Sequence, residues 1–312
     1  MKRRNLSAFC LPAVILLLAT LCGCAGGSAP GISAIPQQDS LIPSSRAADG
    51  SVTYLVLAKQ GKYDKVKSQV AATGARIDQE MPELDALTAA SSDPTFAATL
   101  SSTADVDGVA EDQETSALDE TFLPVDAGTV TATDPSFPTP QDSLYGLQWD
   151  IRRIGGTLQK AWAVTTGNHT IRVAVMDTGI HAEHPDLAPN LLVSLSRNFV
   201  TNSPPQDPAD LSLRDLAGHG TFTASQIAGA FGGGEIVGIG PGLSVVSVKM
   251  INKNGRLWFS WALPALYYAA ANRFEVINMS WSGVIDTSTP ETMVRDLPEQ
   301  KFEGCRQSFQ RS

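Results

Sequence analysis

The chain has 312 residues, of which 43% are hydrophobic and 18% are charged, a composition typical of globular proteins. The formal net charge is −9 at pH 7, and such an acidic protein repels phosphate backbones, so we expect no nucleic acid partner. Of the four cysteines, Cys10, Cys22 and Cys24 lie within the first 24 residues and Cys305 stands alone, so neither a disulfide framework nor a cysteine metal cluster is expected.

Residues 1–23 are predicted to be a lipoprotein signal peptide. A positive start, Lys2 to Arg4, precedes the apolar run 13–21, which is too short to span a bilayer comfortably. The run closes in Leu21-Cys22-Gly23-Cys24, which resembles the bacterial lipobox, where a signal peptidase cuts before a cysteine that then carries lipid. We therefore expect an exported protein of the bacterial cell envelope, anchored to the membrane through lipid on Cys24 or secreted. A plain signal peptide with a chance cysteine is the alternative.

A small compact unit is predicted next in the chain. Residues 24–50, rich in Gly, Ser, Pro and Ala, read as a flexible tether, and the unit follows at 51–114. Its apolar spacing predicts the order β-α-β-β-α-β, which indicates a ferredoxin-like α+β sandwich. The predicted strands are 52–58, 75–81, 84–90 and 106–114, and the predicted helices are 62–74 and a segment with Asp93 as N-cap and Pro94 at its first position.

A proline-rich linker, 115–140, leads to a second domain that we place at 141–297. Its apolar runs are typical of buried parallel strands and alternate with helical segments, which predicts an α/β fold with a parallel sheet. The predicted strands are 171–176, 244–251 and 275–280, and the predicted helices are 158–164, 220–231 and 260–274, the last with a first turn loosened by Pro264.

Asp177 and His219 are the candidate catalytic residues. Asp177 ends a predicted buried strand, and the carboxyl ends of parallel strands are where open α/β sheets place working residues. A turn acid that caps the next segment is the plainer interpretation of Asp177-Thr178-Gly179. His219 stands between two glycines at the mouth of a predicted helix, where small neighbours leave room for substrate. A carboxylate beside an imidazole is the base-and-orienter part of a nucleophilic triad.

The stretches "VAVMDTGI…HPDL" (173–187) and "GHGTFTASQIAGA" (218–230) resemble the Asp and His boxes of the subtilisin-like serine peptidases, also called subtilases or peptidase family S8. The family's catalytic order is Asp, His, Ser. The resemblance covers residues 141–297 and implies a partial subtilisin-like parallel sheet, hydrolysis of peptide bonds and a polypeptide substrate. Residues 51–114 similarly resemble the family's inhibitor-I9-like propeptide, which assists folding and blocks the cleft. The chain's own propeptide is thus a second expected partner.

The resemblance also implies two extended segments that flank the substrate backbone and bind it as an added strand. In this sequence they are Gly255-Arg256-Leu257 and Ser280-Trp281-Ser282. A buried strand end is the alternative for the second segment, in which Ser282 takes a common glycine position.

No cofactor is required by this chemistry, but many relatives bind structural calcium. Asp142 and Asp186 occupy plausible ligand positions, whereas Gly232 falls where a side-chain ligand is often found. His181 and His184 have metal-like spacing, and we interpret them as solvated loop histidines.

Two motifs of the family do not occur in the sequence: G-T-S-M-A-x-P, which carries the serine nucleophile, and A-A-G-N, which carries the oxyanion-hole asparagine. A second departure is Phe222, at a position where the family usually has another histidine. We therefore expect a C-terminally truncated catalytic domain, followed by an unrelated tail at 298–312, and a chain that is inactive as given.

Two other functions stay open. The first is a lipid-anchored, non-catalytic remnant that binds or inhibits another peptidase. The second is an aspartic peptidase, because Asp177-Thr178-Gly179 matches that motif and Asp286-Thr287-Ser288 is a near copy. Aspartic peptidases are all-β proteins that pair two carboxylates, and the helical segment after His219 argues against this class.

Overall fold

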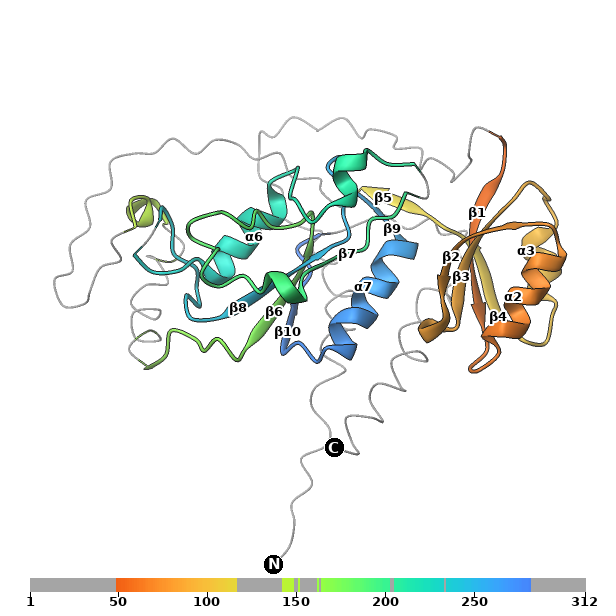
Figure 1. The fold of residues 1–312 in the computed structure, drawn as a ribbon, viewed down its shortest axis with the longest axis horizontal. Coiled ribbons are helices and arrows are strands. Elements are labelled where there is room, and N and C mark those ends of the chain that lie inside the picture. Colours follow the sequence, from red (N-terminus) through yellow and green to blue (C-terminus); the bar gives the residue numbers. More distant parts are fainter. Residues whose placement is uncertain are drawn as a thin grey trace, which may run out of the picture. The chain divides into compact units, whose positions relative to one another are not determined.

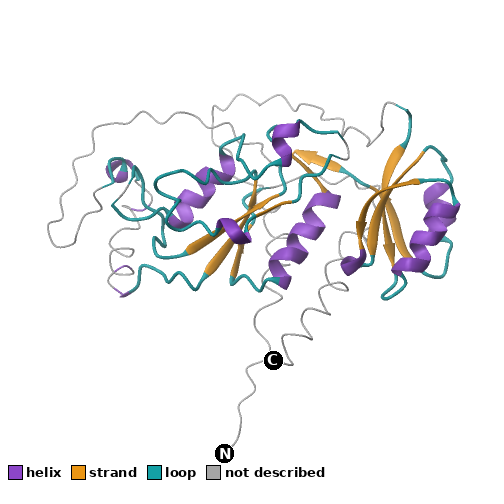
Figure 2. Cartoon of the chain, in the orientation of Figure 1, coloured by secondary structure: helices purple, strands orange, loops and turns teal. Residues whose placement is uncertain are grey.

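The computed structural model describes residues 49–116, 142–148, 151, 162, 164–202, 205–232 and 234–281. All of them belong to one compact unit of the chain, Ile42–Ser312. They form a four-stranded antiparallel sheet with its helices, followed by a four-stranded parallel sheet with its helices (Figures 1 and 2). No helix in the described part of the chain has the length and apolarity needed to cross a membrane. The predicted signal peptide, the lipidation site Cys24, most of the linker and the tail 298–312 lie outside the described residues.

The antiparallel unit confirms the predicted order β-α-β-β-α-β. Its sheet has the strand order β2-β3-β1-β4, with β1 paired antiparallel to both β3 and β4. The strands are β1 (Val52–Ala58), β2 (Arg76–Met81), β3 (Ala86–Ser91) and β4 (Val106–Glu111), and the helices are α2 (Tyr63–Ala72) and α3 (Phe96–Ser101).

Helix α3 starts later than predicted. Asp93 is not its N-cap: the Asp93 carboxylate accepts hydrogen bonds from the backbone N–H and the hydroxyl of Thr95, which makes a turn before the helix. Thr95 is the N-cap residue and Phe96 is the first helical residue. The prediction was wrong because an aspartate can close such a turn with the same hydrogen bonds that it uses to cap a helix.

Strand β1 is buried on both faces, because successive side chains of a strand point to opposite sides of the sheet. Val56 on one face packs in a core with Val66 and Val70 of α2. Leu55 and Leu57 on the other face form a smaller cluster, which Leu263 and Tyr267 of α7 complete.

The parallel sheet has the strand order β10-β6-β8-β7 and also confirms the predicted fold class. Three short strands were not predicted: β7 joins this sheet, whereas β5 and β9 pair antiparallel in a separate two-stranded sheet. The strands are β6 (Arg172–Asp177), β7 (Arg197–Asn198), β8 (Ser244–Lys249), β10 (Val276–Asn278), β9 (Arg256–Trp258) and β5 (Glu114–Ser116), and the helices are α6 (His219–Ala228) and α7 (Phe259–Ala271). Helix α7 continues through Pro264.

Helices α6 and α7 belong to separate cores built on the same strands (Figure 1). Val173 and Val175 of β6 pack with Ala224 of α6, whereas Met176 of the same strand packs with Trp261 of α7. A parallel sheet needs such cover on both faces because its strands are apolar throughout. The packing fixes where β6 ends and therefore where its last residue, Asp177, is held.

Candidate active site

Asp177 is the last residue of β6, a central strand of the parallel sheet, and it is fully buried. Its backbone carbonyl accepts a hydrogen bond from the N–H of Met250, and its carboxylate accepts one from the N–H of Thr178 at 2.7 Å. Burial raises the pKa of the Asp177 carboxyl, and hydrogen bonds from His219 and Thr178 act in the opposite direction. The strand thus presents a rigidly held carboxylate at the edge where parallel sheets build their sites.

His219 is the first residue of α6, and the structure brings its side chain to Asp177. Nδ1 of His219 lies 2.8 Å from Oδ1 and 2.9 Å from Oδ2 of Asp177. Because a carboxylate only accepts hydrogen bonds, the proton between them is assigned to Nδ1, which leaves Nε2 as the basic nitrogen of the ring. This arrangement can orient an imidazole and stabilise its charged form.

Gly220 allows the close approach of the two segments. A Cβ atom at this position would lie 2.1 Å from the carbonyl oxygen of Gly179 and 3.1 Å from Cβ of Asp177. Any side chain here would push α6 away from the loop that follows β6. The glycine after the histidine is therefore needed for packing between the two boxes.

The first predicted substrate segment is already engaged with another part of the chain. Arg256 and Leu257 lie in β9, where they pair in antiparallel register with Ser116 and Thr115 of β5. Gly255 precedes them with a positive φ of 72°. The edge of β9, which could bind an extended substrate, is therefore paired with β5 of this same chain.

The second predicted segment is only partly described. Ser280 exchanges hydrogen bonds with the side chain of Asn278, and Trp281 packs against the core cluster that contains Trp261. The indole N–H of Trp281 is buried without a hydrogen-bond partner among the described residues. Ser282 lies outside them.

The predicted calcium ligands Asp142 and Asp186 are buried and face one loop. The carboxylate of Asp142 accepts hydrogen bonds from the N–H of Gly232, and that of Asp186 accepts them from the N–H groups of Glu235 and Ile236. These carboxylates therefore hold the backbone of the loop, and calcium binding by them stays a prediction. Within the described ranges, no three His, Cys, Asp or Glu side chains converge in a way that could hold a metal.

The histidines with metal-like spacing take separate partners. His184 accepts a hydrogen bond from the N–H of Asp186, and His181 is exposed, 3.8 Å from a carboxylate oxygen of Glu183.

A buried lysine behind the site was not predicted. Lys249 ends β8 in register with Asp177, is 0% exposed, and donates to the carbonyl oxygen of Arg214 at 2.7 Å. Its Nζ also lies 3.4 Å from Oδ1 of Asp210. Burial lowers the pKa of Lys249, and the charge of Asp210 acts to raise it. The only signal in the sequence was a lysine inside an otherwise apolar run.

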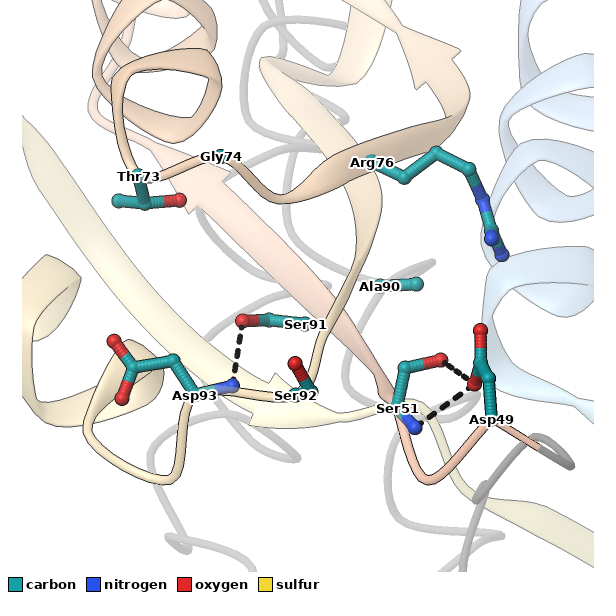
Figure 3. A pocket seen from close by; sticks show the side chains of 9 residues that line it. All are labelled: Asp49, Ser51, Thr73, Gly74, Arg76, Ala90, Ser91, Ser92 and Asp93. Carbon is teal, nitrogen blue, oxygen red and sulfur yellow. Dashed lines mark hydrogen bonds between the residues drawn. The ribbon is translucent and has the colours of Figure 1, made fainter.

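The pocket drawn in Figure 3 belongs to the antiparallel unit and not to this site. Asp49, Ser51, Arg76, Ser91 and Asp93 are among the residues that line it. Asp49 accepts hydrogen bonds from the N–H and hydroxyl of Ser51, and Ser91 accepts one from the N–H of Asp93. The lining is polar and lacks the aromatic side chains that usually surround a small-molecule ligand.

Comparison with known proteins relates this part of the chain to a family of peptidases. Residues 168–306 match the model of the subtilase family of peptidases. The chain is 35% identical to an intracellular serine protease of Paenibacillus polymyxa over 40% of this chain and 36% of that protein. It is 32% identical to subtilisin E of Bacillus subtilis over 41% of this chain and 31% of that protein. The chain thus spans about a third of the length of these curated relatives.

A solved structure shows the same fold. The epidermin leader peptide processing serine protease from Staphylococcus aureus has a TM-score of 0.62 and 18% identity, covering 82% of this chain and 58% of that one. At this level of identity the likeness concerns the fold alone.

Proposed function

We infer that Asp177 and His219 are the orienting carboxylate and the general base of a peptide-bond hydrolase, because residues 168–306 match the subtilase family of serine peptidases. The observation that carries the proposal is the contact of Nδ1 of His219 with both carboxylate oxygens of Asp177, at 2.8 and 2.9 Å. The burial of both side chains supports it, because a buried carboxylate stabilises the imidazolium more strongly than an exposed one.

In this mechanism Asp177 holds the imidazole with its proton on Nδ1. Nε2 of His219 then takes the proton of a serine hydroxyl as that oxygen attacks the peptide carbonyl, and returns it to the leaving amine. No stretch of the 312 residues matches the serine motif G-T-S-M-A-x-P. Loss of the nucleophile from subtilisin lowers turnover about 10⁶-fold, so we propose that the polypeptide of these residues does not turn over by itself.

We propose that the antiparallel unit acts on this domain as an inhibitor-like propeptide. Strand β5 occupies the β9 edge, which the resemblance assigns to substrate, with the antiparallel pairing that extended peptides use. The carboxylate of Asp112 also accepts the N–H of Ser260 at 3.1 Å, in the first turn of α7, where such groups have no partner within the helix. A polypeptide substrate would have to displace β5.

The test uses the polypeptide with and without a nucleophile. We expect no fluorophosphonate labelling and no casein hydrolysis by the 312-residue polypeptide. If translation of the DNA past codon 297 in all frames yields G-T-S-x-A-x-P, a polypeptide extended with that segment should be labelled and hydrolyse casein. Asp177→Asn and His219→Ala should each reduce that rate at least ~10³-fold. Activity that survives both substitutions would overturn the proposal.

An inhibitory role toward another peptidase is a second candidate, favoured by the pairing of β5 with β9. If the antiparallel unit can be released from its own domain, the polypeptide should inhibit added subtilisin, with an inhibition constant that rises when β5 is deleted. Unchanged subtilisin activity at micromolar polypeptide would exclude this role.

The aspartic-peptidase hypothesis fits the structure poorly. Asp177 pairs with an imidazole and stands in an α/β fold, whereas aspartic peptidases are all-β and pair two carboxylates. The near copy at Asp286 lies outside the described residues.

We further propose export and lipid attachment at Cys24, on the strength of the sequence pattern at 13–24. Cells that express the chain should incorporate radioactive palmitate into it. Cys24→Ser should abolish the incorporation, whereas Cys305→Ser should not. Equal incorporation in both variants would contradict the proposal.

A further inference from the structure

Asp215 gathers hydrogen bonds from residues of both boxes. Its Oδ1 accepts from the hydroxyl of Thr178 at 2.8 Å, from the N–H of Gly218 at 2.8 Å and from the N–H of Ala217 at 3.1 Å. Its Oδ2 accepts from the N–H of Thr221 at 2.9 Å and from the hydroxyl of Thr221 at 2.6 Å. One half-buried carboxylate therefore receives five hydrogen bonds.

These donors lie within two residues of the proposed catalytic pair. Thr178 follows Asp177 in the chain, Gly218 precedes His219, and Thr221 stands two residues after it. The hydroxyl of Thr178 also accepts the N–H of Gly220 at 2.9 Å. The contacts form a closed ring in which the end of β6 and the start of α6 are held by the same carboxylate.

The sequence explains why such a group is needed. The N-cap of α6 is Gly218, with φ of 89°, which has no side chain to accept the N–H groups of the first turn. Two of those N–H groups, from Gly220 and Thr221, are instead accepted by Thr178 and Asp215. A carboxylate at this helix end also interacts favourably with the helix dipole.

We propose that Asp215 is a positioning residue, which fixes His219 against Asp177 by tying the loop after β6 to the first turn of α6. This inference rests on the proposed function, because the position of His219 matters only if its ring works with Asp177. Asp215 acts through Thr178 and Thr221, whose hydrogen bonds it accepts.

Asp215→Asn tests the proposal with a small change of shape. Whichever way the amide is turned, its NH₂ group faces the N–H of Thr221 or the N–H of Gly218, so at least one donor loses its acceptor. The measurement is the proton NMR signal of the His219 Nδ1–H in the polypeptide labelled with ¹⁵N-histidine, assigned by its loss in His219→Gln. Hydrogen bonding to a carboxylate moves this signal downfield and slows its exchange with water.

In Asp215→Asn we expect the signal to move upfield or broaden, with exchange about tenfold faster or more. Asp207→Asn is the matched control: Asp207 also caps a short helix, by accepting the N–H of Ala209, but touches neither box. It should leave the signal unchanged. A folded Asp215→Asn variant with the wild-type shift and exchange rate would overturn the proposal.

If Asp215→Asn does not fold, Thr178→Val and Thr178→Ser decide. Serine keeps the hydroxyl that joins Asp215 to Gly220, and valine removes it while preserving the shape of the side chain. We expect the signal to keep its wild-type position in Thr178→Ser and to be perturbed in Thr178→Val; equal signals would overturn the proposal. Absence of the downfield signal from the wild-type polypeptide would instead contradict the contact of Asp177 with His219, and with it the proposed function.

Discussion

The two sheets are covered by helices in different ways. The antiparallel sheet covers one face with its own helices, α2 and α3, and relies on α7 for the cluster on its other face. The parallel sheet has α6 in one core and α7 in the other. Helix α7 thus contributes to both sheets: Trp261 and Ala265 belong to the parallel-sheet core, while Leu263 and Tyr267 pack on the antiparallel sheet. Such a helix must be apolar around most of its circumference.

The chemistry is divided just as unevenly. Asp177, His219 and Asp215 all belong to the parallel domain, at or near the carboxyl end of β6. From the antiparallel side come a strand, β5, and the carboxylate of Asp112. In the proposed function the parallel domain carries out proton transfer and β5 of the antiparallel side occupies its substrate edge. Helix α7 contributes residues to the clusters of both sheets.

The largest expected effect comes from removing the core of α7. Trp261 is fully buried, so Trp261→Ala should lower the free energy of unfolding by about 3–5 kcal/mol. Because α7 packs on both sheets, amide hydrogen exchange should quicken in β8 and in β3 alike. Phe96→Ala, of similar cost in the other core, should quicken exchange in β3 and leave β8 protected. Unchanged protection of β3 in Trp261→Ala would show that α7 does not couple the two regions.

The next effect depends on pH and comes from Asp112. Burial raises the pKa of this carboxyl to about 6, from an ordinary value of 3.8. A raised carboxyl pKa means that the folded state gains stability at low pH and loses it as the pH rises through about 6. The loss is about 3 kcal/mol for a shift of this size.

Asp112→Asn should therefore gain stability relative to the wild type between pH 4 and pH 7, because an amide does not ionise and can still accept the N–H of Ser260. Urea unfolding at several pH values measures this difference. Asp112→Ala leaves that N–H without its acceptor and should be less stable than Asp112→Asn at every pH. A difference between Asp112→Asn and wild type that is flat with pH would show that Asp112 is not buried as an acid.

The sequence predicted the parts of the fold that repeat a pattern. Strands β1, β6 and β8 are six or seven residues long and mostly buried, so their apolar runs were readable. Strands β5, β7 and β9 have only two or three residues, too few to show any period. These short strands exist because a neighbouring segment pairs with them, which is a property of the folded chain.

The residues of the candidate site divide in the same way into those that a local pattern predicts and those that it does not. Asp177 and His219 could be named as candidates because each stands in a local motif, and the structure brings the two side chains into contact. Asp215 was missed because its role depends on Thr178, 37 residues earlier in the chain, and Asp112 was missed because its partner Ser260 is 148 residues away. No local pattern marks a carboxylate whose donors come together only after folding.

The smallest effect lies at the opposite end of β6 from the site. Glu275 accepts hydrogen bonds from the N–H and the guanidinium of Arg172, which joins the start of β10 to the start of β6, and this lowers the pKa of Glu275 to about 2. A lowered carboxyl pKa means that the stabilisation is present above pH 4.5 and disappears as the pH falls through about 2.

Because both side chains are partly exposed, Glu275→Gln should cost no more than about 1 kcal/mol at pH 7, and less in 1 M salt. Urea unfolding at pH 7 and pH 2 measures the change, and the free energies of unfolding of the wild type and Glu275→Gln should converge at pH 2. The downfield His219 signal should be unaffected, because Arg172 and Glu275 lie at the amino ends of their strands. A change in that signal would mean that the amino end of the parallel sheet, and not only Asp215, determines how His219 meets Asp177.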